Sequence, residues 1–377
     1  MHVAINASFW GQETTGTGQY LHRLIAELAA TPGVELSSLA ARALTTASGP
    51  GIRRLSTPVD LLGVDIAKLW FEQVTFARES RRLGCDVAHV PYFAPPLHHR
   101  VPVVVTIHDL IPMLLPAYRG SRAVRLYTSL VARAAARADL IITDSTASAR
   151  DILRLLRIGQ ERLRVIPLAA GEQYHPLPEA EITPVLARHG LEPPYILYLG
   201  GFDVRKNVPL LIKAFRGVAA CSDVTLVIAG RLPDRPSDFA PDPRPLVQQL
   251  GLSGRVRFLG LVAEDDKPAL YGGALAFVFP SQYEGFGLPV LEAIACGTPA
   301  VVTSGSSMDE VAGPGGLRVL HDRADLLAAA LLRLINEPGL RQELREAGLA
   351  HASRFSWRRV AQETLEAYAD ASRQSRA

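Results

Sequence analysis

Two carboxylates, Glu284 and Glu292, frame a glycine-rich turn in the second half of the sequence, with seven residues between them. Carboxylate oxygens accept hydrogen bonds from sugar hydroxyls, and the backbone N–H groups that glycines leave exposed can hold a phosphate. A pair of glutamates at this spacing usually lies on a solvated helix surface. The spacing therefore indicates a ligand-binding site only if the predicted secondary structure around the two glutamates supports one.

That context is a strand–turn–helix segment. The apolar run at 274–279 predicts a strand, and residues 288–296 predict a helix. A helix N-terminus carries unpaired N–H donors and partial positive charge, which favour an anion. We therefore expect this turn to bind a ligand that carries both phosphate and hydroxyl groups. Its expected binding residues are Glu284, Gly285, Phe286, Gly287, Leu288 and Glu292.

The block EGFGLPVLEAIACGTPAVV, which begins at Glu284, resembles the E-x7-E signature of the retaining glycosyltransferases of family 4. The resemblance implies an α/β protein with the GT-B fold, in which two Rossmann-like doubly wound parallel-sheet domains face each other across a cleft. It extends from the TGTGQY loop to the FSW segment before the last helix. It also implies transfer of a sugar from a nucleotide-diphosphate sugar, with retention and without a further cofactor.

The composition is compatible with a two-domain globular protein. The chain has 377 residues, 48% of them hydrophobic, and a formal net charge of +3, which argues against a nucleic-acid binder. Three scattered cysteines suit neither a disulfide framework nor a zinc site and favour a reducing cytoplasm. The start, MHVAINASF, predicts a strand rather than a signal peptide. No apolar run approaches the roughly 18 residues of a transmembrane helix.

Apolar runs alternate with helical patterns along most of the chain, which predicts parallel sheets. Prolines and acidic residues interrupt this alternation at 178–194, which we interpret as an interdomain linker. We expect an N-terminal, acceptor-side domain at 1–177, a donor domain at 195–355 and a last helix within 356–377. In the resembled family this helix crosses back onto the N-terminal domain.

Ligands of open α/β sheets bind beyond the carboxyl ends of the strands, so the loops that follow predicted strands are candidate site segments. The predicted strands are Val3–Ala7, Val101–Ile107, Leu140–Thr143, Arg164–Pro167, Tyr195–Leu199, Thr225–Ala229, Val256–Leu259, Ala274–Phe279 and Ala300–Thr303. The predicted helices include Gln19–Ala30, Ser121–Ala138, Val208–Val218, Lys267–Gly272, Leu288–Cys296 and Trp357–Ala371.

The loop TTGTGQYLHRL places Gly16 and Gly18 before a predicted helix, where glycines permit close approach to a phosphate. Leu21 stands where a dinucleotide-binding fingerprint needs a third glycine, so NAD binding is not expected. An ordinary pair of loop glycines is the alternative. The resemblance implies that this loop covers the donor diphosphate and that Gln19 and Tyr20 border the acceptor site.

His108 and Asp109 follow the apolar strand at 101–107. A lone histidine is more often a structural residue, but its place at the end of a parallel strand favours a function. The resemblance implies that His108 is catalytic and lies near the donor sugar. Asp109 would orient the imidazole or contact acceptor hydroxyls.

Basic residues follow two predicted strands of the second half. Arg205 and Lys206 precede a helix, where cations could neutralise a diphosphate. The family's R-K-N pattern implies that Lys206 is a catalytic diphosphate ligand. Gly201 stands where some members carry another basic residue, so the second cation must be Arg205 or Arg231. Arg231 is equally well interpreted as a solvated loop residue.

The segment VRFLGLVAEDDKPALY resembles the part of the family that lies against the nucleobase. The resemblance implies contacts from the Val262 backbone and from Lys267. A turn that leads into a surface helix is an equally good interpretation of Lys267.

These patterns predict a hexosyltransferase that needs no metal, and we find no D-x-D pair at a strand end. Lys206, Arg205 and the amides of 285–288 would stabilise the departing diphosphate. The resemblance implies that Glu284 binds donor-sugar hydroxyls and Glu292 the ribose. GDP-mannose is the favoured donor and a UDP-sugar the alternative. The acceptor would be a glycan, a lipid-linked glycan or a small molecule.

Three other functions remain open: a non-catalytic nucleotide-sugar-binding partner, a UDP-sugar epimerase on the same fold, and a sugar phosphorylase. Glu284, Lys206 and His108 are all present, which argues against the first. The E-x7-E block in this form argues against the second. No lysine lies in a context typical of bound pyridoxal phosphate, which argues against the third.

One feature lies outside these loops. On the predicted helix at 121–138, four arginines fall within an arc of about 120°: Arg122, Arg125, Arg133 and Arg137. Such a stripe is usually a solvated face. The alternative is an acidic acceptor or peripheral contact with anionic lipid at the inner face of the plasma membrane.

Overall fold

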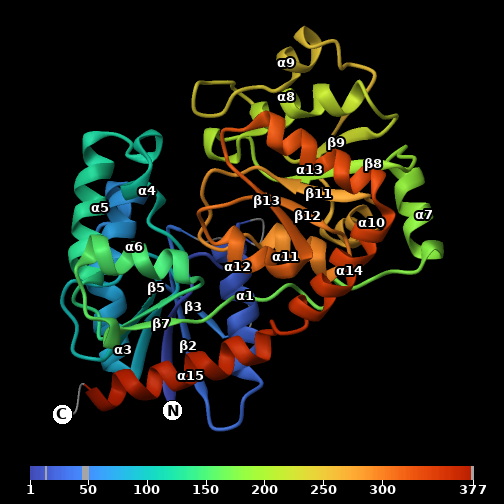
Figure 1. Cartoon of the computed structure of the whole chain (residues 1–377). Coiled ribbons are helices and arrows are strands. Elements are labelled where there is room, and N and C mark those ends of the chain that lie inside the picture. The colour runs from blue at the N-terminus through green and yellow to red at the C-terminus, as the bar shows by residue number, and fades with distance from the viewer. Residues whose placement is uncertain (13–14, 45–50, 375–377) are drawn as a thin grey trace. The chain divides into compact units, whose positions relative to one another are not determined.

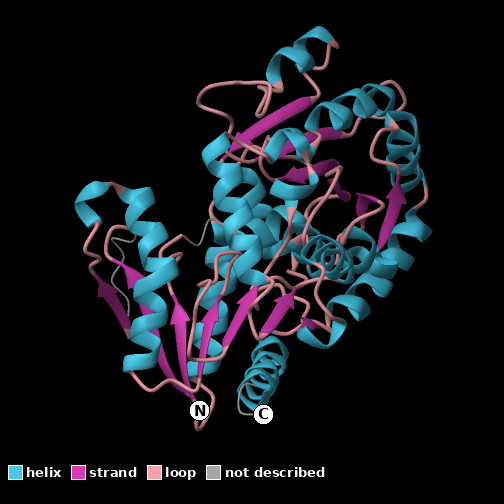
Figure 2. Cartoon of the chain, turned by 90° about the vertical axis from the view of Figure 1, so that its left-hand side faces the viewer, coloured by secondary structure: helices cyan, strands magenta, loops and turns pink. Residues whose placement is uncertain are grey.

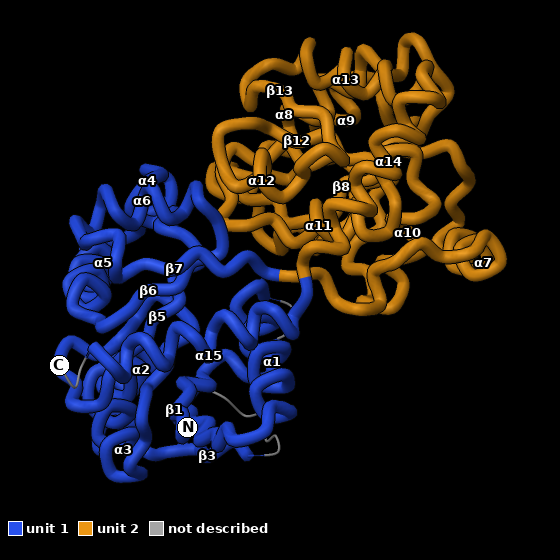
Figure 3. Tube along the Cα trace, turned by 60° about the horizontal axis from the view of Figure 1, so that its bottom comes forward, with its two compact units in different colours: residues 1–168, 356–377 blue, residues 169–355 orange. Residues whose placement is uncertain are grey.

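The structure, a computed structural model, describes residues 1–12, 15–44 and 51–374 (Figure 1). The chain forms two compact units (Figure 3). Unit 1 comprises Met1–Leu168 and Ser356–Ala377, and unit 2 comprises Ala169–Phe355. The second division coincides with the predicted one at 355/356. The first falls after Leu168, rather than after residue 177 as predicted.

The predicted linker at 178–194 lies within unit 2 instead. Most of it forms helix α7 (Glu179–Arg188), which packs on α10 (Lys267–Gly272). Pro178 directly precedes the helix, a position where the backbone N–H that proline lacks would have no partner within the helix. Two glutamates in the first turn complement the helix dipole. The prolines and acidic residues that indicated a linker are therefore equally typical of a helix start.

Unit 1 is a parallel sheet with the strand order β3-β2-β1-β4-β5-β6-β7. Its strands are β1 (His2–Asn6), β2 (Glu35–Ala41), β3 (Ile52–Leu55), β4 (Val87–Val90), β5 (Val103–Thr106), β6 (Leu140–Thr143) and β7 (Leu163–Val165). Its α-helices are α1 (Gly16–Ala29), α2 (Val64–Trp70), α3 (Phe76–Arg82), α4 (Ile111–Leu114), α5 (Arg122–Ala135), α6 (Thr146–Leu156) and α15 (Trp357–Gln374). Shorter segments are the 3₁₀ turns η1 (Asp60–Leu62), η3 (Pro116–Tyr118) and η4 (Gln160–Arg162) and the π-helix η2 (Phe71–Thr75).

Unit 2 is a second parallel sheet, with the order β10-β9-β8-β11-β12-β13. Its strands are β8 (Tyr195–Leu199), β9 (Thr225–Ala229), β10 (Val256–Gly260), β11 (Ala276–Phe279), β12 (Ala300–Thr303) and β13 (Gly316–Val319). Besides α7 and α10, its α-helices are α8 (Val208–Ala219), α9 (Arg244–Gln249), α11 (Leu288–Ala295), α12 (Met308–Ala312), α13 (Ala324–Asn336) and α14 (Pro338–Ala352). Its 3₁₀ turns are η5 (Val204–Lys206), η6 (Glu264–Asp266) and η7 (Gly313–Gly315).

Every predicted strand overlaps an observed strand, but β2, β3, β4 and β13 escaped prediction. Polar residues interrupt the apolar run in several of them. β2 carries Ser37 and Ser38, and β4 carries His89. His89 is fully buried, and each of its ring nitrogens has a hydroxyl group as hydrogen-bond partner. A buried polar residue with partners costs little.

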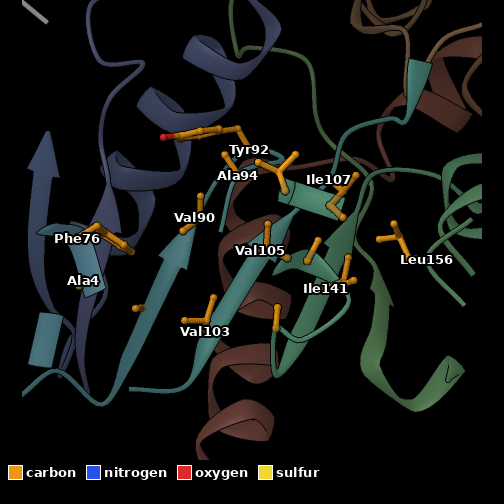
Figure 4. Close-up of a cluster of buried hydrophobic side chains, with 14 of the residues drawn as sticks. Ala4, Phe76, Val90, Tyr92, Ala94, Val103, Val105, Ile107, Ile141 and Leu156 are labelled. Carbon is orange, nitrogen blue, oxygen red and sulfur yellow. The ribbon is translucent and has the colours of Figure 1, made fainter. Parts of the chain in front are cut away.

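Strands buried on both faces form the centre of each unit, as expected for parallel sheets with helices on both sides (Figure 2). In unit 1, Val90, Val103, Val105 and Ile141 come from three neighbouring strands and pack in one cluster (Figure 4). The C-terminal helix α15 belongs to this unit and packs on α1 and beside β4, β5 and β6.

A buried chain of hydrogen bonds attaches α15 to the sheet of unit 1. The Tyr368 hydroxyl lies 2.7 Å from His89 Nδ1, and Thr106 Oγ1 lies 2.8 Å from His89 Nε2. The Tyr20 hydroxyl continues the chain at 3.0 Å from Thr106 Oγ1. Burial lowers the pKa of His89 to about 3, so this imidazole is neutral and one of its nitrogens accepts.

Both sheets have a topological switch point. In each sheet, the next strands in sequence are added on one side of the first strand, and the later strands on its other side. The switch point therefore lies between β1 and β4 in unit 1 and between β8 and β11 in unit 2. Loops that leave the two central strands diverge to opposite faces and open a crevice at the carboxyl edge. Ligand-binding residues are expected in these loops.

Candidate active site

The switch point of unit 2 brings Glu284, Lys206 and Arg205 together. Lys206 and Arg205 lie in η5, which follows β8, and Glu284 lies in the loop that follows β11. The Lys206 Nζ donates to Glu284 Oε1 at 2.7 Å, and an Arg205 Nη atom lies 2.5 Å from Oε2. Ser281 donates its hydroxyl to Oε1 at 2.6 Å. The two predicted cations and the first predicted glutamate therefore form one buried cluster.

The charge state of Glu284 follows from this cluster. Burial alone would raise its pKa, but Lys206 and Arg205 outweigh burial and lower the pKa to about 2. The carboxylate is therefore ionised at neutral pH. It has about four lone-pair sites, of which Lys206, Ser281 and Arg205 occupy three. Counting only partners among the described residues, one acceptor site remains for a ligand hydroxyl.

The glycine-rich turn joins this cluster to the start of α11. Gly287 precedes the helix with φ 103°, a conformation that residues with a side chain rarely adopt, and a Cβ atom there would also displace the end of the Met308 side chain, so the turn favours glycine. The Ser307 hydroxyl lies 2.8 Å from the carbonyl oxygens of both Glu284 and Phe286 and fixes the turn. Among the described residues, no side chain caps α11. Pro289 has no N–H and the Val290 N–H donates to the Gly287 carbonyl oxygen, so the Leu288 N–H is the first-turn donor that remains for a ligand.

Glu292 lies on α11, and its environment differs from that of Glu284. Its carboxylate is buried and accepts from the Tyr271 hydroxyl at 2.9 Å. Burial raises the pKa of Glu292 to about 7, and Lys267 and the Tyr271 hydrogen bond offset only part of this effect. The two glutamates of the E-x7-E block thus titrate in different pH ranges, because Glu284 has two cations beside it.

The segment after β10 approaches Glu292 through aromatic and charged side chains. Tyr174 packs edge-on against Tyr271, and its hydroxyl donates to Glu264 at 3.3 Å. Lys267 forms an ion pair with Glu264, and only 13% of the Lys267 side chain is exposed. Val262, two residues before Glu264 in the sequence, is buried. Lys267 is therefore largely buried and is not the surface residue of the alternative interpretation.

Arg231 does not join the cluster. Its side chain is exposed and pairs with Asp234 at 2.9 Å, the geometry of a solvated loop residue. No hydrogen bond or ion pair links it to Glu284 within the described part of the chain. Arg205 is therefore the second cation of the cluster, which corrects the expectation that Arg231 is an equal candidate.

In unit 1, His108 follows β5 and is oriented by Asp144, which follows the neighbouring strand β6. His108 Nδ1 lies 2.6 Å from Asp144 Oδ2, and both side chains are largely buried. Burial alone would lower the pKa of His108, but the charge and hydrogen bond of Asp144 raise it above its usual value. Nε2 is buried and makes no hydrogen bond of ordinary geometry among the described residues, although the backbone of Pro91 also contributes to the raised pKa.

Asp109 does not orient the imidazole. Its carboxylate accepts from the backbone N–H of Ile111 at 2.9 Å and thereby caps the short turn that follows β5. We expected Asp109 either to orient the imidazole or to contact acceptor hydroxyls, and the second role stays a prediction. The hydrogen-bond partner of His108 is Asp144, which follows the neighbouring strand β6. The two side chains meet because the carboxyl ends of parallel strands lie at the same edge of the sheet.

The glycine-rich loop near the N-terminus is the first turn of α1 rather than a loop before it. A Cβ atom on Gly18 would lie 2.0 Å from the carbonyl oxygen of Gln12, so packing within the chain already requires this glycine. Gly16 has open space around it. Thr14, which belongs to the quoted loop, lies outside the described residues.

Tyr20 is not on an acceptor-facing surface, which corrects another expectation. It is buried, and its ring contacts His108 edge-on at a centroid distance of 5.0 Å. Gln19, its neighbour, is partly exposed. Tyr20 lies on the inner face of the amphipathic helix α1, so it supports His108 rather than a ligand.

Sequence comparisons agree with this geometry. The family model described as "Glycosyl transferases group 1" matches residues 186–351, and the model "Glycosyltransferase Family 4" matches residues 14–170. O-antigen chain mannosyltransferase B of Escherichia coli is 33% identical over 286 residues, which cover 75% of this chain and 74% of that protein. This chain belongs to glycosyltransferase family 4.

A second curated relative is the MMP alpha-(1->4)-mannosyltransferase of Mycolicibacterium hassiacum. It is 32% identical over 235 residues, which cover 60% of this chain and 53% of that protein. Both relatives transfer mannose by name. As a family 4 enzyme, the chain is a glycosyltransferase that uses a nucleotide sugar.

Solved structures place this family 4 glycosyltransferase in the GT-B fold. Sucrose-phosphate synthase of Thermosynechococcus elongatus matches with a TM-score of 0.77 and 21% identity over 98% of each chain. HepE of Anabaena, in complex with UDP and glucose, matches with a TM-score of 0.73 and 19% identity over 97% of this chain and 98% of that one. The predicted fold class is therefore confirmed.

Asp144 and Ser281 are the site residues that sequence reasoning missed. Asp144 follows the predicted strand at 140–143 directly, so the same strand-end rule that selected His108 could have found it. Ser281 carries no such signal, because its role depends on where Glu284 lies. Within residues 1–12, 15–44 and 51–374, no three His, Cys, Asp or Glu side chains converge as metal ligands do.

Proposed function

We propose that this glycosyltransferase transfers a hexose with retention at the anomeric carbon and without a divalent metal. The favoured donor is GDP-mannose. The observation that carries the proposal is the cluster in which Glu284 is held between Lys206 and Arg205 at the start of α11. The leaving group of the reaction is a nucleoside diphosphate, and this cluster supplies fixed positive charge for it.

The cations and the helix start would stabilise the departing diphosphate. Lys206 and Arg205 are partly buried and already oriented, so they need little reorganisation when charge develops on the leaving oxygen. Glu284 keeps the two like charges together before the donor binds. Its remaining acceptor site would take one hydroxyl of the donor sugar, which would set the orientation of the anomeric carbon.

His108 would donate from Nε2 to the donor sugar. The Asp144 carboxylate holds the opposite nitrogen, so the imidazole is oriented and its protonated form is favoured. We assign no protein nucleophile, because the diphosphate oxygen that leaves can itself accept the proton of the attacking acceptor hydroxyl. Retention would follow from attack on the same face.

The choice of guanine as the base rests on Glu264. Guanine presents two neighbouring donors, N1–H and the N2 amino group, which suit one carboxylate. The Glu264 side chain is half exposed and lies in the segment after β10. Its carboxylate pairs with Lys267 and accepts a hydrogen bond from the Tyr174 hydroxyl. The mannosyltransferase names of the two curated relatives support the same donor.

The acceptor would be a glycan, and an O-antigen-like polysaccharide is favoured by the name of one relative. A lipid-linked form of such an acceptor would bring the enzyme to the anionic inner face of the plasma membrane. A soluble small-molecule acceptor is the alternative.

A panel of nucleotide sugars tests the donor. Because a ligand that binds only the folded state raises the melting temperature, GDP-mannose is expected to raise it more than UDP-glucose at equal concentration. NMR of the product with GDP-mannose and a mannose-containing acceptor is expected to show the donor's anomeric configuration. Stabilisation by UDP-sugars alone would overturn the choice of guanine. An inverted product would overturn retention, and a change of the donor sugar without an acceptor would indicate an epimerase.

A further inference from the structure

An aromatic ring lies against one of the two cations of the candidate site. The Nζ atom of Lys206 lies over the face of the Phe279 ring, 4.8 Å from its centre. Phe279 is the last residue of β11 and is fully buried. Only 14% of the Lys206 side chain is exposed. The negative face of an aromatic ring attracts a cation in this position, and the attraction is stronger where water is excluded.

Aromatic neighbours hold the Phe279 ring in place. Tyr198 of β8 and Phe277 of β11 lie nearly parallel to it, with centroid distances of 6.2 Å and 5.8 Å and interplanar angles of 20° and 22°. Both neighbours are fully buried. The Tyr198 hydroxyl donates to the carbonyl oxygen of Gly201, in the loop that leads from β8 to η5. The ring therefore has a fixed position relative to the loop that carries Lys206.

The two cations of the site are held in different ways. Arg205 has two carboxylates near it, because Glu284 lies 2.5 Å away and Asp203 lies 3.7 Å away. Among the residues that the structure describes, Lys206 has one carboxylate partner, Glu284. Its second contact is with the uncharged ring of Phe279. Lys206 therefore keeps more of its positive charge than Arg205 does.

An uncharged contact suits a cation that has to bind an anion. A second carboxylate in place of the ring would also fix the ammonium group, but at this distance it would repel a diphosphate. The ring attracts the cation without adding negative charge. A lysine ammonium has three N–H donors, and Lys206 uses one of them on Glu284. Within the described ranges the other two have no hydrogen-bond partner, so they can donate to phosphate oxygens.

We propose that Phe279 is a positioning residue of the transfer reaction, whose ring holds the Lys206 ammonium group at the diphosphate site before the donor binds. If the ligand had to order a free lysine side chain, the lost rotamer freedom would lower its affinity by up to about 30-fold. The ring and Glu284 together order this side chain in advance. This role rests on the proposed function, because it takes Lys206 to be a diphosphate ligand.

NMR of the lysine side chains tests the contact itself. The chain has four lysines, so labelling them with ¹³C gives few signals. Protons over an aromatic face resonate upfield, and we expect this shift for the ε-methylene group of Lys206 without any donor. Phe279→Leu should remove it. Lys68, which lies 5.3 Å from the centre of the Tyr127 ring, gives a comparison shift, and an unchanged signal from Lys267 would report an intact unit 2.

Fluorinated rings test whether the attraction contributes to ligand binding. Fluorine withdraws electrons from the ring face and changes the size of the ring little, so each fluorine weakens the attraction for a cation. When Phe279 is replaced by phenylalanine with one, two or three fluorines, affinity for GDP should fall about twofold for each fluorine, and Phe279→Leu should lower it about tenfold. Calorimetry on the full-length protein measures these affinities, with UDP as the probe if the donor panel selects a UDP-sugar.

Phe277 is the matched control. It is as deeply buried as Phe279 and packs beside it, but no cation lies over its ring in the described part of the chain. The same fluorinated residues at position 277 should leave the affinity for GDP unchanged. In a Lys206→Met background, fluorination of Phe279 should also have no effect, since no cation remains to be held. In Glu284→Gln, where Lys206 loses its carboxylate partner, each fluorine at Phe279 should have a larger effect than in the wild type.

Two results would overturn the role of Phe279. One is a Lys206 signal that is not shifted upfield, or a shift that Phe279→Leu leaves in place. Another is an affinity for GDP that stays constant or rises along the fluorine series at Phe279, although Lys206→Ala still weakens binding. If Lys206→Ala itself leaves the affinity unchanged, Lys206 is not a diphosphate ligand. The proposed function then fails, and the role of Phe279 with it, even where NMR shows the contact.

Discussion

Lys206 Nζ lies 2.7 Å from Glu284 Oε1, although 78 positions separate the two residues in the sequence. The contact joins the loop after β8 to the loop after β11, the two strands that flank the switch point of unit 2. Glu284 thereby holds Lys206 and Arg205 side by side without a ligand. The proposed site for the diphosphate would therefore be largely organised before the donor arrives.

Glu284→Gln should separate binding from transfer. The amide cannot neutralise Lys206 and Arg205, so we expect affinity for the free nucleoside diphosphate to stay the same or increase. Turnover should fall about 10²- to 10³-fold, because the sugar loses its carboxylate and the cations lose their fixed geometry. Calorimetry and a transfer assay at saturating donor measure the two effects. Near wild-type turnover would refute the assignment.

Lys206→Ala should weaken binding of both the nucleoside diphosphate and the sugar donor, by about 10- to 100-fold, because it removes a buried charge-assisted hydrogen bond. Arg231→Ala is the matched control. That arginine is exposed and paired with Asp234, so its loss should leave both affinities unchanged. The assignment fails if the two variants behave alike in calorimetry.

Glu292 should make donor binding depend on pH. Burial raises its pKa to about 7, and only the ionised carboxylate accepts hydrogen bonds from both ribose hydroxyls. Affinity for the sugar nucleotide should therefore rise from pH 5 toward pH 7, by at most about tenfold per unit, and level off above it. A sugar nucleotide is the suitable probe, because its diphosphate diester does not titrate in this range.

The control for this dependence is Glu292→Gln, which has no carboxyl group to ionise. Its affinity should be lower than that of the wild type at pH 8 and nearly constant with pH. A wild-type affinity that does not change between pH 5 and pH 8 would show that Glu292 is ionised throughout or does not contact the ribose.

Asp144→Asn should move the pH profile of turnover. Asp144 raises the pKa of His108, so its neutral substitute lowers that pKa and should shift the basic limb of the profile to lower pH. Affinity for the nucleoside diphosphate should not change, since the proposed diphosphate ligands Lys206 and Arg205 lie in unit 2. In a double-mutant cycle, Asp144→Asn should have no further effect on the profile of His108→Gln. An unchanged basic limb would contradict the role of Asp144.

Turnover should persist in excess EDTA. In the proposed mechanism, Lys206, Arg205 and the Leu288 N–H at the start of α11 would provide the charge that a divalent cation would otherwise supply to the diphosphate. The assay needs enzyme that has been dialysed against the chelator before the donor is added. Loss of activity that manganese or magnesium specifically restores would refute the metal-independent reaction.

Local sequence determined much of the donor side. The turn from Glu284 to Gly287 and helix α11 are contiguous, so a strand signal, a glycine-rich turn and an apolar helix were sufficient to predict them. The strand-end rule likewise selected His108 and Lys206, because strand ends in a parallel sheet share one edge. The alternation of strands and helices predicted both sheets without their order.

Tertiary structure alone decided which of these side chains meet. Asp144 rather than Asp109 orients His108, because the pairing of β5 with β6 brings their ends together, whereas the adjacent Asp109 turns back to cap Ile111. Tyr20 is buried because it lies on the inner face of α1, and Arg231 pairs with Asp234 in solvent. A sequence specifies which groups reach the edge of a sheet. The hydrogen-bond partner of each group is set by the strands and helices that pack beside it.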